Sequence, residues 1–207
     1  MIFPGRLLMS TNVKRKFRTR KASSLFDRID PCSREFEHKV VPKFSANVIR
    51  ELGKGIETEK VASRLLLHGS KPRAVAQIAL FIGSADEKID VALVLARRHK
   101  RLVYRIDLLR IVGKYIGQTE KNLTRVMDAA HNSEAILFLD DADALFSGQP
   151  DKGDGPQPCT AMQTTYILDR LARYDGLVIL SVKAISAADE AYAQRLYYVA
   201  KFRRRRS

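Results

Sequence analysis

Two adjacent carboxylates, Asp140 and Asp141, are the residues whose position most directly suggests chemistry. They follow residues 136–139, an apolar run with the length of a buried strand. Carboxylates at the end of such a strand can hold a divalent cation and polarise a water molecule for attack on a phosphoryl group. An aspartate after a strand can also cap the helix that follows. On the pair alone, both interpretations are open.

The elements around this pair alternate between strand and helix patterns. Short apolar runs predict four strands and a fifth near the end of the chain: 79–82, 102–106, 136–139, 177–180 and 197–202. Helical spacing of apolar residues predicts four helices: 42–56, 90–98, 120–130 and 161–173. Two stretches with glycine and proline predict loops: 69–74 and 147–158. Strands that are apolar on both faces and separated by helices are typical of a parallel sheet covered on both sides.

Such a sheet should bring the polar residues of the strand ends together. Gly83 follows the first strand, Asp140 and Asp141 follow the third, and residues 181–183 follow the fourth. Ligands of open α/β sheets bind at the carboxyl ends of the strands. We therefore expect these residues, although distant in sequence, to line one crevice.

Several segments resemble, in order and spacing, those of AAA+ ATPases. Residues 113–123 (Gly-Lys-Tyr-Ile-Gly-Gln-Thr-Glu-Lys-Asn-Leu) are similar to a run that follows the family's second strand. Residues 136–146 resemble its Walker B strand, 168–171 and 174–180 the helix and strand leading to sensor 1, and 189–195 the run that carries its arginine fingers. The resemblance covers about residues 40–202. It implies an α/β fold, a three-layer P-loop NTPase-like domain with a parallel sheet between helices, in which ATP and Mg²⁺ bind and hydrolysis drives protein remodelling.

The resemblance places a phosphate loop, the Walker A motif, directly after the first strand. The family pattern is Gly-x-x-x-x-Gly-Lys-Thr, whose lysine contacts phosphates and whose threonine holds Mg²⁺. Here the loop is one residue short, Glu87 stands at the second glycine and Ile89 at the threonine. Two like unit charges about 4 Å apart repel by about 4 kcal/mol at an effective dielectric of 20, so a turn without any phosphate role is at least as good an interpretation. The candidate nucleotide-binding residues are Gly83, Ser84, Ala85, Asp86, Glu87, Lys88 and Ile89.

The resemblance assigns the remaining roles to four residues. Asp140 would hold Mg²⁺ through water, and Asp141, in place of a usual glutamate, would activate the attacking water with a reach shorter by about 1.5 Å. Lys183 stands where sensor 1 usually has asparagine. Arg195 is the second of two finger positions, the first being Gln194, and could act only on a neighbouring subunit's nucleotide in a ring. The family's small lid does not follow, so no complete helical lid is expected.

Lys183 also suggests how the fold could exist without a metal ion. Two acids at a buried strand end need a cation, because an unpaired buried charge is costly. We hypothesise that the Lys183 ammonium takes the metal's place beside Asp140 and Asp141. The alternative, equally open, is that its side chain extends into solvent.

Composition and charge limit the setting of the protein. Its 207 residues are 45% hydrophobic and contain no apolar run long enough to span a bilayer, which is typical of a globular, non-membrane chain. Cys32 and Cys159 lie far apart, which fits a reduced, cytoplasmic compartment. The net charge of +14 comes largely from two clusters, 14–21 and 203–206. We expect a basic, irregular extension over 1–38, the α/β domain over 39–202 and a basic tail over 203–207.

Three functions remain open at this stage. The first is a AAA+ domain whose ATP binding and hydrolysis are weakened or lost, so that it is either an ATPase or a pseudo-ATPase. The second is a non-catalytic interaction or regulatory subunit of a homo- or hetero-oligomeric AAA+ ring that contacts a protein substrate or partner. The third is nucleic-acid binding through the basic ends, near which aromatic residues that could stack on bases are sparse.

Overall fold

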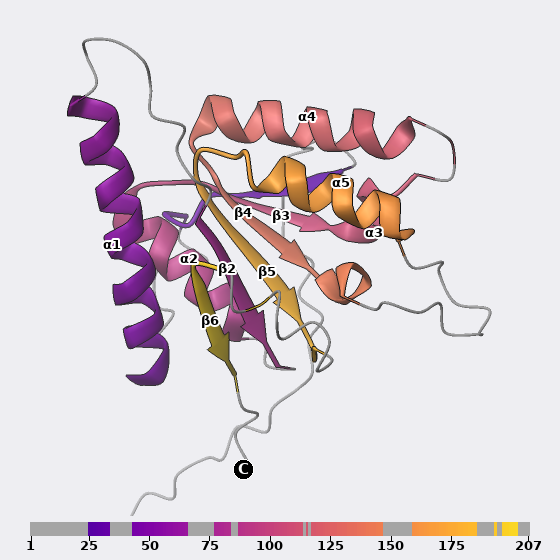
Figure 1. Cartoon of the computed structure of the whole chain (residues 1–207). Coiled ribbons are helices and arrows are strands. Elements are labelled where there is room, and N and C mark those ends of the chain that lie inside the picture. Colours follow the sequence, from indigo (N-terminus) through magenta and orange to yellow (C-terminus); the bar gives the residue numbers. More distant parts are fainter. Residues whose placement is uncertain are drawn as a thin grey trace, which may run out of the picture.

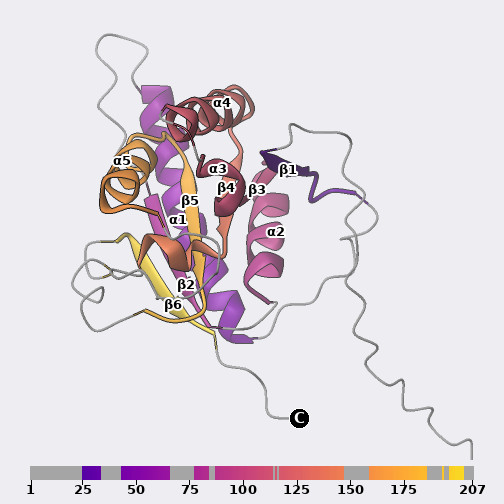
Figure 2. The same cartoon turned by 90° about the vertical axis from the view of Figure 1, so that its right-hand side faces the viewer.

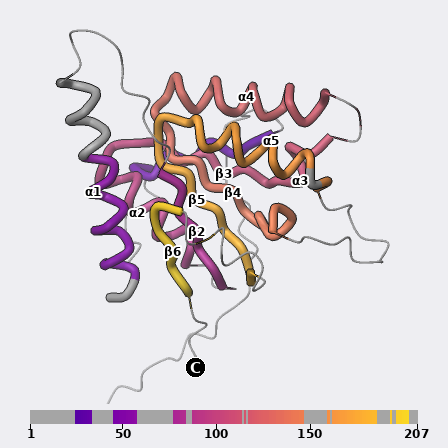
Figure 3. The backbone as a smooth tube through the Cα atoms, viewed as in Figure 1, coloured from indigo at the N-terminus to yellow at the C-terminus, as the bar shows by residue number. Residues whose placement is uncertain are grey.

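The chain forms one α/β sheet with helices on both faces (Figure 1). The computed structural model describes residues 25–33, 43–65, 77–83, 87–113, 115, 117–146, 159–185, 193 and 196–202. Figure 3 traces these residues in colour along the backbone. None of the described helices is long and apolar enough to cross a membrane.

The sheet has six strands in the order β1-β3-β4-β5-β2-β6. All neighbouring strands are parallel except β1, which pairs antiparallel with β3. The carboxyl ends of β4, β5 and β2, three neighbours in this order, therefore lie at one edge. The strand bounds are β1 Phe26–Ile29, β2 Gln77–Ile82, β3 Val103–Asp107, β4 Ile136–Asp140, β5 Leu177–Val182 and β6 Tyr198–Lys201.

Alternating side chains of the strands feed two hydrophobic clusters, one on each face. Along β2, Leu80 belongs to one cluster and Phe81 to the other, and Leu137 and Phe138 of β4 divide in the same way. Helices α4 (Gln118–Ser133) and α5 (Ala161–Leu171) cover the first face. Helices α1 (Lys43–Leu65) and α2 (Glu87–His99) cover the second, as the edge-on view shows (Figure 2). Full burial of each such side chain contributes about 1.5–3 kcal/mol, which makes the two-sided sheet the dominant stabilising feature.

Local signals place the ends of several helices. The first turn of α2 carries Glu87 and Asp90, and its last turn carries Arg97, Arg98 and His99, which complements the helix dipole. Helix α5 begins with a capping box between Thr160 and Gln163. The short helix α3 (Leu108–Ile111) begins where the Asp107 side chain accepts a hydrogen bond from the Leu109 N–H.

The expected fold class is confirmed, and several elements differ in extent. Each strand pattern corresponds to a strand of the sheet, while α1 runs nine residues past the expected position 56, to Leu65. The expected irregular extension over 1–38 contains β1, whose Phe26 stacks on Tyr104 of β3 with ring centroids 4.5 Å apart. A four-residue strand is too short to show periodicity, and tertiary pairing fixes it. The loops expected at 69–74 and 147–158 lie outside the described residues.

Candidate functional site

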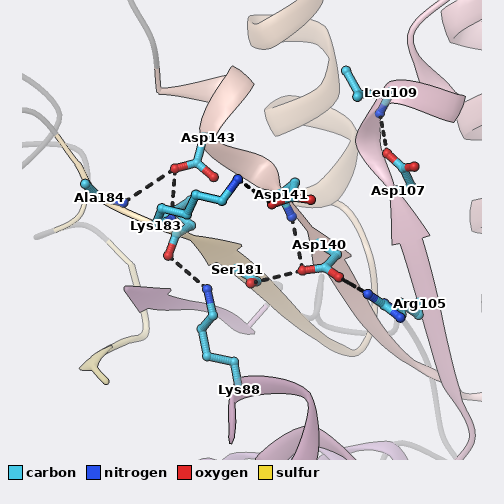
Figure 4. A network of polar contacts seen from close by, with 11 residues as sticks. Lys88, Arg105, Asp107, Leu109, Asp140, Asp141, Asp143, Ser181, Lys183 and Ala184 are labelled. Carbon is cyan, nitrogen blue, oxygen red and sulfur yellow. Dashed lines mark hydrogen bonds and ion pairs between the residues drawn. The ribbon is translucent and has the colours of Figure 1, made fainter. Parts of the chain in front are cut away.

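Residues from β4, β5 and α2 meet at the carboxyl edge of the sheet. Asp140 ends β4 and Asp141 follows it, Ser181 and Val182 end β5 and Lys183 follows them, and Lys88 lies in the first turn of α2. Lys183 Nζ lies 3.0 Å from Asp141 Oδ1, Ser181 Oγ donates to Asp140 Oδ1 at 3.3 Å, and Lys88 Nζ donates to the Val182 carbonyl at 3.0 Å (Figure 4). The structure thus brings together residues that the parallel-sheet argument placed in one crevice.

Asp140 is paired with a cation that the sequence analysis did not single out. Arg105 Nε donates to Asp140 Oδ2 at 2.9 Å, and Arg105 Nη2 donates to the same oxygen. The other oxygen, Oδ1, accepts from Ser181 Oγ and, at 3.2 Å, from the Asp141 N–H. The side chains of Arg105 and Asp140 are only 32% and 24% exposed. Both carboxylate oxygens of Asp140 are therefore engaged within the chain.

Strand register explains how Arg105 reaches Asp140. In the parallel pair of β3 and β4, Arg105 lies opposite Phe138, and Asp107 lies opposite Asp140. All four share one face of the sheet, so the long Arg105 side chain can extend along the strand to the carboxylate. A signal was present in the sequence, because a charged residue inside an otherwise apolar strand requires a partner.

Asp141 makes an exposed ion pair with Lys183. The two side chains are 63% and 70% exposed, and the hydrogen bond from the ammonium raises the pKa of Lys183. Asp141 adopts the left-handed conformation (φ 49°) and is the N-cap residue of η2, the 3-10 helix Ala142–Leu145. Its side chain makes no capping hydrogen bond to this described helix, so the capping interpretation does not apply to Asp141. The hypothesis that Lys183 neutralises both acids holds for Asp141 only, because Asp140 has Arg105.

Asp143 fixes the position of the segment that carries Lys183. Its Oδ1 accepts hydrogen bonds from the N–H groups of Lys183, at 2.8 Å, and Ala184, at 3.4 Å. Its Oδ2 is buried and has no hydrogen-bond partner among the described residues. Burial lowers the pKa of Lys88 and the hydrogen bond to Asp141 raises the pKa of Lys183, and in both lysines the charge of Asp143 is a smaller contribution that favours the charged form. Asp143 therefore ties η2 to the end of β5.

Lys88 is a buried cation that points toward the end of β5. Its side chain is 8% exposed, and burial lowers the pKa of Lys88, partly opposed by Asp140, Asp143 and Asp141. The Val182 carbonyl that accepts from Lys88 also accepts from the Gly83 N–H at 2.9 Å. The Lys88 ammonium is thus bound by the backbone at the end of β5.

The other residues of the expected phosphate loop are placed as follows. Gly83 follows β2 with φ +131°, Glu87 is the first residue of α2, and Ile89 is partly buried against the cluster under α2. Three of the expected residues lie outside the described ones: Ser84, Ala85 and Asp86. The same holds for Gln194, Arg195 and the basic clusters 14–21 and 203–206.

This donor set does not fit Mg²⁺. Ile89, with a hydrocarbon side chain, stands where the family has the threonine whose hydroxyl binds Mg²⁺. Both oxygens of Asp140 accept hydrogen bonds from the chain. No group of three or more histidine, cysteine or acidic residues in the described part of the chain could hold a metal ion. Mg²⁺ requires oxygen ligands in near-octahedral geometry. The resemblance assigns phosphate contact to Lys88, and the first turn of α2, which carries Lys88, also carries the acidic Glu87 and Asp90.

Solved structures show the same fold. The structure of the E. coli MS115-1 HORMA:CdnC:Trip13 complex contains a chain that superposes with a TM-score of 0.55 and 16% identity, over 88% of this chain and 71% of that chain. At this identity the likeness concerns the fold alone.

Sequence comparisons point to one family, and a match to the model of that family shows it. The chain is 28% identical over 134 residues to the uncharacterized AAA family ATPase y4kL of Sinorhizobium fredii, covering 64% of this chain and 38% of that protein. It is 29% identical over 80 residues to the ATPase family gene 2 protein of Schizosaccharomyces pombe, covering 38% of this chain and 10% of that protein. The chain thus spans less than two fifths of either relative. The model of the family "ATPase family associated with various cellular activities (AAA)" matches residues 88–203, more than half of the chain, and the chain therefore belongs to the AAA family.

Proposed function

We propose that this AAA domain does not hydrolyse ATP and acts as a non-catalytic subunit beside other proteins. The observation that carries the proposal is the pairing of both acids after β4 with cations of the same chain. Arg105 holds Asp140, and Lys183 holds Asp141. The two acids that the family resemblance assigns to the metal ion and the attacking water are thus each paired with a basic residue of the same chain.

The chemistry of hydrolysis is weakened at several points at once. A general base must accept a hydrogen bond from the attacking water, and one oxygen of the Asp141 carboxylate, Oδ1, already accepts a hydrogen bond from Lys183. Its side chain is also shorter than a glutamate by about 1.5 Å, and a displacement of about 1 Å can reduce a rate about 100-fold. Ile89 supplies no hydroxyl for a metal ion. Because the base and a metal ligand are both affected, we expect no measurable hydrolysis of ATP.

The arguments against ATP binding are weaker than the arguments against ATP hydrolysis. Family membership suggests nucleotide binding in general. Lys88 can leave the Val182 carbonyl without orphaning it, because the Gly83 N–H still donates to the same oxygen. Glu87 and Asp90 repel a polyphosphate at the start of α2, however. We therefore infer that any ATP binds weakly and through Lys88.

A phosphate-release assay tests the loss of hydrolysis. The full chain, incubated with ATP and Mg²⁺, should release phosphate no faster than its Asp141→Asn variant, because Arg105 holds Asp140 and Ile89 supplies no hydroxyl for the metal ion that hydrolysis needs. Turnover by the wild type that Asp141→Asn abolishes would contradict the proposal. Calorimetric ATP titrations of the wild type and Lys88→Ala, with and without Mg²⁺, separate binding from hydrolysis. A weak signal that Lys88→Ala removes would support binding through Lys88.

The role as a subunit is tested by assembly. The solved structure that shares this fold is that of a complex of several proteins, and the resemblance to AAA+ ATPases implies a ring. We expect the chain to co-elute with a catalytically active AAA relative after mixing and to change that relative's ATPase rate. A strictly monomeric particle whose elution and effect are unchanged by the relative would count against this role.

A further inference from the structure

The disagreement between the donor set and Mg²⁺ has a specific cause in β3. We propose that the Arg105 guanidinium occupies the position of the divalent cation at Asp140 and thereby excludes Mg²⁺ from the edge of the sheet. The inference deepens the proposed function and rests on it for the assignment of this edge as the former nucleotide site. It names Arg105 as the residue that determines which cation Asp140 takes.

The contacts of Arg105 are those of a bound cation. Two of its N–H groups donate to Asp140 Oδ2, one at 2.9 Å, and the pair lies partly buried between neighbouring strands. Asp140 Oδ1, the oxygen left over, already accepts from Ser181 and from the Asp141 N–H. A metal ion at Asp140 would have to displace the guanidinium and then find its other ligands among water molecules.

The competition favours the guanidinium over the metal ion. Arg105 is attached to the adjacent strand, so its local concentration at Asp140 is high and independent of the solution. Its planar guanidinium is weakly hydrated and loses its water molecules more readily than Mg²⁺, which dehydrates reluctantly. Lys88 is a second cation close enough to Asp140 for their charges to interact, and it repels a dication. The Asp140 carboxylate, both of whose oxygens already accept hydrogen bonds, does not offset these three effects.

The exposed pair of Lys183 and Asp141 is a useful contrast. These side chains are 70% and 63% exposed, and surface pairs of this kind are weak and screened by salt. Removing Lys183 should therefore not open a metal site. Removing Arg105 should do so, because Arg105 is the cation that contacts the Asp140 carboxylate directly.

The experiment is thermal unfolding of the full chain without nucleotide, in MgCl₂ and in NaCl of equal ionic strength. The wild type should unfold at the same temperature in both salts. Arg105→Gln should gain a Mg²⁺-specific rise of about 3–5 °C once Mg²⁺ is about tenfold above its Kd. Arg105→Gln combined with Asp140→Asn should lose that rise. Lys183→Asn and Arg173→Gln, which breaks the exposed pair with Asp169, should behave as the wild type does.

Two outcomes would overturn the proposal. One is a Mg²⁺ response of the wild type that Asp140→Asn abolishes, and the other is an Arg105→Gln variant that folds and gains no response. If Arg105→Gln does not fold, Mn²⁺ titration of the wild type by electron paramagnetic resonance decides instead, since a bound Mn²⁺ that depends on Asp140 contradicts exclusion. These experiments measure no hydrolysis, so their results are independent of the phosphate-release assay. If the wild type hydrolyses ATP but its unfolding temperature does not respond to Mg²⁺, the result counts against the proposed function alone.

Discussion

At the scale of single residues, the defining feature is a set of charged side chains, some exposed and some buried, that all find partners within the chain. Arg105 and Lys183 each pair with one acid after β4, while Lys88 is buried and donates to a backbone carbonyl. Burial lowers the pKa of Lys88 despite the nearby carboxylates, so the folded state disfavours its charged form. Lys88 thus destabilises the fold slightly at neutral pH.

Replacing Lys88 by methionine should accordingly stabilise the protein at neutral pH. We expect a higher free energy of unfolding, because the buried charge is removed and Gly83 still donates to the Val182 carbonyl. The cost of Lys88 is present below its folded pKa and disappears as the pH rises from that value toward 10.5, its ordinary value. The advantage of Lys88→Met, measured by urea unfolding across this range, should shrink in parallel.

The exposed Lys121 on α4 provides the matched control. Lys121→Met removes the same charge from a solvated position and should leave the free energy of unfolding nearly unchanged. Destabilisation by Lys88→Met would mean that attraction to Asp140 and Asp143 outweighs the cost of burial.

At the scale of elements, the turn after β2 is the most constrained part of the site. Gly83 has φ +131°, and a Cβ atom there would lie 2.1 Å from the carbonyl oxygen of Phe202, just past β6. The same region is held by the hydrogen bond from the Phe202 N–H to the Ile82 carbonyl, 2.7 Å. Strand β6 therefore leaves room only for glycine at the start of the expected phosphate loop.

Gly83→Ala should for this reason cost roughly 2–4 kcal/mol, from both backbone strain and the steric contact with Phe202. Gly117→Ala is the control, because Gly117 also has a positive φ (+78°) but a Cβ atom there would meet no atom of the described residues within 4 Å. It should cost only about 1–2 kcal/mol. Chemical denaturation of both variants measures the difference. If both lose the same free energy of unfolding, Phe202 moves away from the new Cβ atom at little cost.

At the scale of the whole molecule, two hydrophobic clusters and the antiparallel β1 hold the domain together. The clusters lie on opposite faces of one sheet, so α4 and α5 on one side and α1 and α2 on the other depend on the same strands. Strand β1 covers the edge of β3, the strand that carries Arg105. A segment near the start of the chain thereby supports the candidate site.

Phe26→Ala should lower the free energy of unfolding by roughly 3 kcal/mol, because Phe26 is buried and stacks on Tyr104. Denaturant unfolding followed by circular dichroism measures the loss, and Arg28→Ala, at an exposed position of the same strand, is the control. A loss no larger than that of Arg28→Ala would indicate that β1 contributes little to the sheet.

The sequence by itself determined the class of the fold and predicted the sheet edge at which the residues of the candidate site meet. Apolar runs and helical spacing are local patterns, so they predicted the parallel strands, the covering helices and Asp140 and Asp141 at the end of β4. The same local motifs carried the resemblance to AAA+ ATPases, which the family match confirms. The roles assigned to Ser84, Ala85, Asp86 and Arg195 stay predictions, because these residues lie outside the described part of the chain.

Only the tertiary structure decided which charges pair. The sequence offered Lys183 as the cation for both acids, whereas the strand register brings Arg105 to Asp140 and leaves Lys183 to Asp141. The antiparallel pairing of β1 was likewise invisible, because four residues carry no readable period. The physical reason is the same in both cases. An ion pair or a strand pairing depends on which segments become neighbours in the sheet, and that order is set by packing of the whole chain rather than by any local pattern.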